Sequence, residues 1–71
     1  MSDFEVSNEY KLDILNKRLE QLNIEGWHNE EARLIAQATL NTEEVTRLND
    51  NIEIIKNAIT AVKEQITALT A

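Results

Sequence analysis

Apolar residues in the C-terminal half of the chain recur at alternating spacings of three and four, the heptad repeat of a coiled coil. The stripe consists of Val45, Leu48, Ile52, Ile55, Ile59, Val62, Ile66 and Leu69. A strict seven-residue repeat keeps one apolar row facing a partner helix, whereas a chance helical face drifts away from that period. These residues therefore predict a long helix that packs against other helices.

A second helical pattern occupies the N-terminal part of the chain. Its main face consists of Phe4, Leu12, Leu15, Leu19 and Leu22. A shorter stripe on nearly the opposite side consists of Val6, Tyr10 and Ile14. Ser2 followed by Glu5 matches a capping box, which indicates that this helix begins near residue 3.

The only glycine predicts the end of the first helix. Gly26 can adopt the left-handed conformation that closes a helix, and Asn29 is a good N-cap for the next one. The expected fold is all-α: a helical hairpin with a short first helix, about 3–25, and a long second helix, about 30–70. Asn41 followed by Glu44 also matches a helix start, so a three-helix bundle broken near residue 41 is the alternative. Continuation of the stripe back through Ala38 and Leu34 favours one long helix.

These helix lengths predict an uncovered surface. At about 1.5 Å per residue, the first helix spans roughly 33 Å and the second roughly 60 Å. The first helix then covers the second only to about residue 52, and the apolar stripe beyond it requires another chain. We therefore expect the whole stripe, Val45 to Leu69, to form an oligomer interface. β-Branched residues at both core positions of the heptad favour a trimer, with an antiparallel dimer or tetramer next.

Length and composition agree with self-association. The 71 residues form one domain, whose core supplies only about 3–5 kcal/mol of stability. The absence of cysteine excludes disulfides and thiolate metal sites, and one histidine does not make a structural metal site. Oligomerisation is the remaining means of stabilising so small a domain.

The charge of the chain limits its partners. The net charge is −6 and the seven Lys and Arg residues are scattered, whereas a nucleic-acid-binding protein clusters them. Anionic membrane surfaces are disfavoured for the same reason, and no apolar run reaches the ~18 residues of a membrane span. The N-terminus lacks the basic and apolar regions of a signal peptide. We expect a cytoplasmic or virion-associated protein that binds neither nucleic acid nor membranes.

Catalytic chemistry has little support in the sequence. His28 stands near Glu30 and Glu31, but the remaining residues of a zinc or nucleophilic site are missing. We expect no catalytic residue, no metal and no cofactor. Trp27, the only tryptophan, is a candidate anchor for a partner protein, as are Tyr10 and Ile14. The alternative for Trp27 is that it packs over the hairpin core.

The sequence therefore predicts a non-enzymatic structural or assembly protein, a homo-oligomeric coiled-coil subunit or adaptor of a larger complex. An acidic, cysteine-free coiled coil rich in Asn, Thr and Ile resembles small bacteriophage or bacterial assembly proteins in general character. The alternative is a small modulator or inhibitor whose amphipathic helices cover a different protein.

Overall fold

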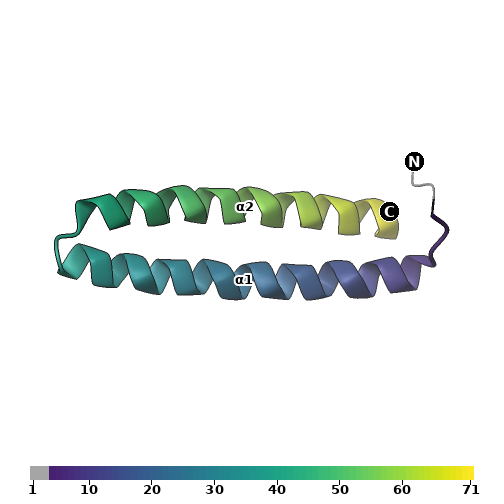
Figure 1. Ribbon diagram of the computed structural model, residues 1–71. Coiled ribbons are helices and arrows are strands. Elements are labelled where there is room, and N and C mark those ends of the chain that lie inside the picture. The colour runs from purple at the N-terminus through teal and green to yellow at the C-terminus, as the bar shows by residue number, and fades with distance from the viewer. Residues whose placement is uncertain (1–3) are drawn as a thin grey trace.

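The computed structural model describes residues 4–71 as two antiparallel α-helices of nearly equal length (Figure 1). Helix α1 comprises Asn8–Ala38 and helix α2 comprises Thr42–Thr70. They run side by side over their whole length, so that the C-terminus lies near the start of α1 (Figure 1). Between residues 4 and 71 there is no strand. The predicted all-α helical hairpin is confirmed.

Helix α1 is longer than the sequence predicted, because it continues through Gly26. The expected turn at residues 26–29 is wrong: the backbone is helical there, and the Asn29 side chain donates to the Glu25 carbonyl at 2.8 Å. A glycine inside a helix costs only about 1 kcal/mol relative to alanine, which packing along a full-length partner outweighs. Gly26 faces α2, where an added Cβ would lie 3.6 Å from Ile55 Cγ2.

Helix α1 begins at Asn8 rather than near residue 3. Ser7 is the N-cap, and its hydroxyl accepts a hydrogen bond from the Tyr10 amide at 3.1 Å. The capping box predicted from Ser2 and Glu5 does not start this helix, because Glu5 precedes it, and Ser2 lies outside the described residues. The N-cap is therefore Ser7, which lies later in the sequence than the predicted Ser2.

The chain reverses at residues 39–41 through a Schellman motif. The Leu40 amide donates to the Gln37 carbonyl at 3.2 Å, and the Asn41 amide donates to the Ala36 carbonyl at 2.9 Å. Leu40 has a φ of 56°, the left-handed conformation that usually belongs to glycine at this position. The Leu40 side chain is 85% exposed. The turn thus satisfies the carbonyls at the end of α1 without a glycine.

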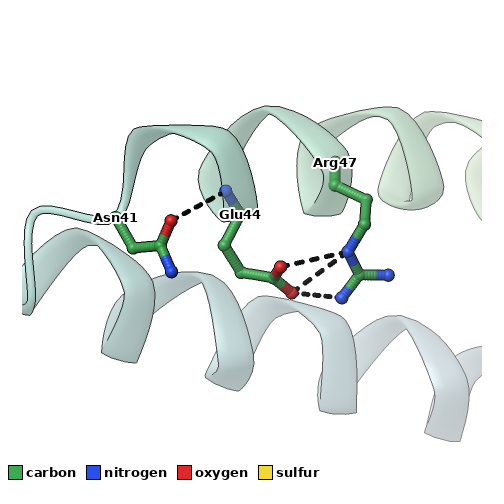
Figure 2. A network of polar contacts seen from close by, with 3 residues as sticks. All are labelled: Asn41, Glu44 and Arg47. Carbon is green, nitrogen blue, oxygen red and sulfur yellow. Dashed lines mark hydrogen bonds and ion pairs between the residues drawn. The ribbon is translucent and has the colours of Figure 1, made fainter.

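Asn41 starts α2, as the alternative interpretation of the sequence had it. Its side-chain oxygen accepts a hydrogen bond from the Glu44 amide at 3.2 Å, and the Glu44 carboxylate binds the Arg47 guanidinium (Figure 2). A break near residue 41 is therefore present, but the segment before it belongs to α1. The result is a two-helix hairpin and not a three-helix bundle.

The core is a single interface between the two helices. Helix α1 contributes a second heptad row, composed of Leu12, Leu15, Leu19, Leu22, Gly26, Asn29, Arg33 and Ala36. Two contacts set the alignment: Gly26 lies against Ile55, and Arg33 Nη1 donates to Asn49 Oδ1 at 2.9 Å. The buried side chains are Leu15, Ala36, Leu48, Ile52, Ile55 and Val62.

Candidate functional site

The predicted interface stripe lies against the chain's own first helix. Leu48, Ile52, Ile55 and Val62 are buried within the hairpin. Half-buried members of the stripe are Val45, Ile59, Ile66 and Leu69. The expected uncovered segment from Ile52 to Leu69 is wrong, because a 31-residue α1 matches a 29-residue α2 along its length. That these residues also line an oligomer interface stays a prediction, and it applies best to the half-buried ones.

The surfaces available to a partner are the two faces that flank this interface. In an antiparallel helix pair, heptad positions c and g of both helices lie on one side, and positions b and e lie on the other. Two grooves that span both helices confirm this division: Ile14, Arg18, Gln65 and Ala68 line one, and Trp27 and Lys56 line the other.

We call the first surface the neutral face. It consists of Lys11, Ile14, Arg18, Gln21, Glu25, His28, Ala32 and Ile35 of α1, with Glu44, Arg47, Asn51, Ile54, Ala58, Ala61, Gln65 and Ala68 of α2. Its three cationic and two acidic side chains give a net charge of +1. Its apolar members include two strongly exposed isoleucines, Ile35 at 66% and Ile54 at 64%.

We call the opposite surface the tryptophan face. Its charged and aromatic members are Glu9, Asp13, Glu20, Trp27, Glu30, Glu53, Lys56 and Lys63. Five acidic and two basic side chains give this face a net charge of −3. Five of its α2 positions are threonines, Thr42, Thr46, Thr60, Thr67 and Thr70. The acidity of the chain is therefore placed here and on the outer edges of the helices, away from the neutral face.

The open end of the neutral face is hollowed into a groove of about 910 Å³. Its lining is Val6, Tyr10, Lys11, Ile14, Leu15, Arg18, Gln65, Ala68 and Leu69. Two of the predicted partner-binding residues, Tyr10 and Ile14, thus come together with the C-terminal end of α2. Tyr10 is exposed and Ile14 is half-buried. An apolar groove rimmed by two cationic side chains is suited to protein contact.

Trp27, the third predicted partner-binding residue, lies on the other side of the hairpin. It is 59% exposed in the middle of α1, and its ring meets the His28 ring edge to face at a centroid distance of 5.4 Å. A shallow groove of about 490 Å³ places Trp27 beside Leu19 and Ile24. The structure does not bring Trp27 together with Tyr10 and Ile14, so the predicted residues belong to two separate surfaces.

Sequence reasoning missed Ile35 and Ile54, the strongly exposed large apolar side chains of the neutral face. Both occupy heptad position c, counted from Leu12 in α1 and from Val45 in α2. The signal was therefore present, but it becomes visible only once the heptad of α1 is continued through Gly26. A turn placed at Gly26 assigns Ile35 to a different helix and hides the repeat.

Apart from the Arg33–Asn49 hydrogen bond between the helices, the ion pairs of the described residues are local. Lys17 pairs with Asp13 at 3.0 Å, one helical turn away. The hydrogen bond from Arg47, together with its charge, lowers the pKa of Glu44, and the same contact raises the pKa of Arg47. Among residues 4–71, no group of three or more His, Asp or Glu side chains is arranged to hold a metal ion. Neither described helix is long and apolar enough to cross a membrane.

Comparison with protein families, with curated proteins and with solved structures gives no match to this chain. Function is therefore inferred from the surfaces of the hairpin.

Proposed function

We propose that this protein is a non-enzymatic structural subunit, a helical hairpin that associates with copies of itself and serves as a component or adaptor of a larger protein assembly. The observation that carries the proposal is the incomplete burial of its apolar residues. Half of the predicted stripe remains half-buried after the hairpin forms, and further isoleucines project from one flanking face.

The total surface of the hairpin supports association. It exposes 5688 Å², whereas a compact monomer of 8.1 kDa exposes about 4,500 Å². The excess is on the order of 1,200 Å², more than the roughly 800 Å² that each partner buries in a standard interface. The elongated shape, 50 × 20 × 18 Å, accounts for this excess, because two helices enclose no interior layer.

The small core points the same way. Of the described side chains, six apolar ones are buried and none is fully buried. A two-helix core of this size supplies only a few kcal/mol, and the chain has no cysteine with which to add a disulfide. Association of hairpins buries the remaining apolar surface, which contributes about 25 cal/mol of favourable free energy per Å². Association therefore stabilises the fold of each chain as well as the oligomer.

The test is the mass in solution, measured with helicity by circular dichroism at about 1 and about 100 μM protein. We expect an oligomer at the higher concentration, and a parallel fall of mass and helicity on dilution. The mass also distinguishes the trimer that the β-branched core positions favour from a dimer of hairpins. A fully helical monomer at both concentrations would contradict self-association.

A modulator that binds a different protein is the second candidate, and the tryptophan face favours it. Trp27, Ile24 and Leu34 are all exposed there or on the adjoining edge of α1. Aromatic anchors of this kind dominate many protein interfaces. Capture of a stoichiometric non-self protein that is lost in Trp27→Ala, with the oligomer mass unchanged, would support this role. That the larger complex is a phage virion or a bacterial assembly stays a prediction from the character of the sequence.

A further inference from the structure

We propose that the neutral face is the contact between two copies of this chain, which pack antiparallel about a two-fold axis into a four-helix bundle. This inference rests on the proposed self-association and specifies its surface, its number of chains and its orientation. In this arrangement α1 packs on α1 of the second copy, and α2 packs on α2. Neighbouring helices are antiparallel throughout, as in up-and-down bundles.

The spacing of the c positions on α1 defines where the axis falls. Ile14 and Ile35 lie at equal distances from the point between Ile24 and Glu25. A two-fold axis there places Ile14 of one copy against Ile35 of the other. The strongly exposed Ile35 then enters the groove at the open end of the second hairpin, which Ile14 lines. A hollow at one end of the face and a projecting side chain at the other are complementary only in an antiparallel pair.

The residues of helix α2 fit the same axis. Ile54 and Ala61 lie at equal distances from the point between Asn57 and Ala58. An axis there places the exposed Ile54 against the small Ala61 of the second copy, and it brings the two Ala58 side chains together at the centre. A large residue opposite a small one allows two helices to approach closely.

The alignment of the hairpin brings these two points to the same level. Each lies eight and a half residues from the Arg33–Asn49 hydrogen bond, in the same direction along the hairpin. The Gly26–Ile55 contact gives the same alignment to within one residue, about 1.5 Å. One axis therefore satisfies both helices, because the hairpin alignment places the c positions of α1 level with the c positions of α2.

Polar positions follow the same pairing. About this axis Gln21 lies opposite His28, and Asn51 lies opposite Gln65 to within one residue, so that side chains able to form hydrogen bonds face one another. Glu25 lies next to the axis, so the two Glu25 carboxylates of the pair face each other between Gln21 and His28. The centre of the α1 contact is therefore polar, while its apolar contacts lie at its two ends.

The alternative is a two-fold axis parallel to the helices, which places α1 of one copy on α2 of the other, with both turns at the same end. This arrangement pairs polar side chains with apolar ones. It would place His28 against Ile54 and Ile35 against Arg47, which buries polar groups on apolar ones. It would also bring Lys11 and Arg18 of both copies to the same end. The antiparallel pair instead places the cations of one copy at the end where the second copy carries the Glu44–Arg47 ion pair, so Lys11 and Arg18 of the two copies stay at opposite ends.

Charge selects this face for a second copy in particular. Two chains of net charge −6 repel each other, and that repulsion is least where the contacting surface is itself near neutral. The neutral face carries +1 and the tryptophan face −3. The whole chain measures 50 × 20 × 18 Å, so a pair in contact along one full side buries on the order of 2,000 Å² in total, the range of stable homodimers.

A matched pair of substitutions tests the choice of face. Ile35→Glu and Leu34→Glu each replace an exposed apolar residue of α1 by a glutamate. Ile35, on the neutral face, is 66% exposed, and Leu34, on the tryptophan face, is 57% exposed. We expect Ile35→Glu to weaken the dimer by at least roughly 100-fold in Kd, because it buries a carboxylate in each copy. Leu34→Glu leaves the dimer intact. Sedimentation equilibrium of both variants and of the unmodified protein gives the Kd, with circular dichroism as the check on folding.

Engineered cysteines test the axis, because the chain has none of its own. Under oxidation, Ala58→Cys should form a covalent dimer, since the two copies of residue 58 meet at the axis. Ala61→Cys, on the same face, should not, because its two copies lie about seven residues, or roughly 10 Å, apart along the bundle. Fast crosslinking through residue 61 and none through residue 58 would overturn the proposed alignment.

The outcomes separate this inference from the function on which it rests. A monomeric unmodified protein contradicts both. An unmodified oligomer that survives Ile35→Glu and dissociates in Leu34→Glu contradicts the neutral face while self-association stands. If the unmodified protein is a trimer, the two-fold bundle is contradicted. The number of chains would then follow from the heptad stripe, as the sequence predicted.

Discussion

The two halves of the hairpin differ in the α1 residues that face α2, whereas the α2 residues that face α1 are of the same kind in both halves. In the half near the chain ends, the α1 row consists of Leu12, Leu15, Leu19 and Leu22. In the half near the turn, it consists of Gly26, Asn29, Arg33 and Ala36. The α2 row is branched and apolar in both halves. The comparison thus shows how the α1 row affects the burial of the α2 side chains opposite it.

The half with the less apolar partner row is the better buried. In the half near the turn, Leu48, Ile52 and Ile55 are buried and Val45 is half-buried. In the other half of the α2 row, Val62 is buried, and Ile59, Ile66 and Leu69 are only half-buried. Gly26 leaves room for Ile55 to approach the backbone of α1, and the small Ala36 is itself buried. Where both helices carry large side chains, part of each side chain remains exposed to solvent. An apolar heptad is therefore not a measure of burial, and the leucine half is where a second chain adds most.

The largest effect that tests this contrast is truncation of one core leucine from each half. Leu48→Ala removes a buried side chain and should lower the free energy of unfolding by about 2–4 kcal/mol, including the cavity that remains. Leu19→Ala removes a half-buried one and should cost about 1–2 kcal/mol. Urea denaturation at one fixed protein concentration measures both. Equal losses would mean that the two halves are equally packed in solution.

The boundary between the halves is tested by Gly26→Ala. The substitution removes backbone entropy from the unfolded chain, and its new Cβ meets Ile55 Cγ2 at 3.6 Å, an ordinary contact. We expect the protein to be stabilised by about 0.5–1 kcal/mol. The melting temperature, followed by circular dichroism, shows the sign. A lower melting temperature would show that the helices approach more closely at Gly26 than this separation indicates.

The smallest effect concerns pH at the turn end. Because Arg47 lowers the pKa of Glu44 below the ordinary value of 4.5, this contact stabilises the fold above that value. Its contribution is lost as the pH falls through the pKa of the folded state. Glu44→Gln should therefore lower the melting temperature slightly at pH 7 and have no such effect once the carboxyl group is protonated.

Glu43→Gln is the matched control for this pH effect, since it removes the same charge from the same first turn of α2. It should change the melting temperature less than Glu44→Gln at pH 7. An equal change in the two variants would assign the effect to the helix dipole and not to the Arg47 contact.

The position of the turn shows where sequence reasoning reached its limit. Gly26 and Asn41 both carry recognised signals for the end or start of a helix, and the sequence favoured the first. Local preference at Gly26 is worth only about 1 kcal/mol, less than the packing gained when α1 extends over a full-length partner. Leu40 adopts a left-handed conformation in the actual turn, which no residue preference would predict.

The candidate site shows the same division. Tyr10 and Ile14 could be singled out from the sequence as apolar residues off the main face, and they do line a groove. Ile35 and Ile54 could not be assigned to one surface, because that surface exists only when the two helices are aligned. Trp27 stood out by its residue type, yet it lies on the other face of the hairpin.

The sequence by itself determined the helical class and the heptad row of α2, because periodicity is a property of short segments. It offered the cap at Asn41 only as the alternative to one long helix. Only the tertiary structure decided that Gly26 lies inside a helix, that α1 covers the whole of α2, and which side chains share the neutral face. These outcomes depend on the pairing of distant residues, whose packing energy exceeds the local preferences along the chain.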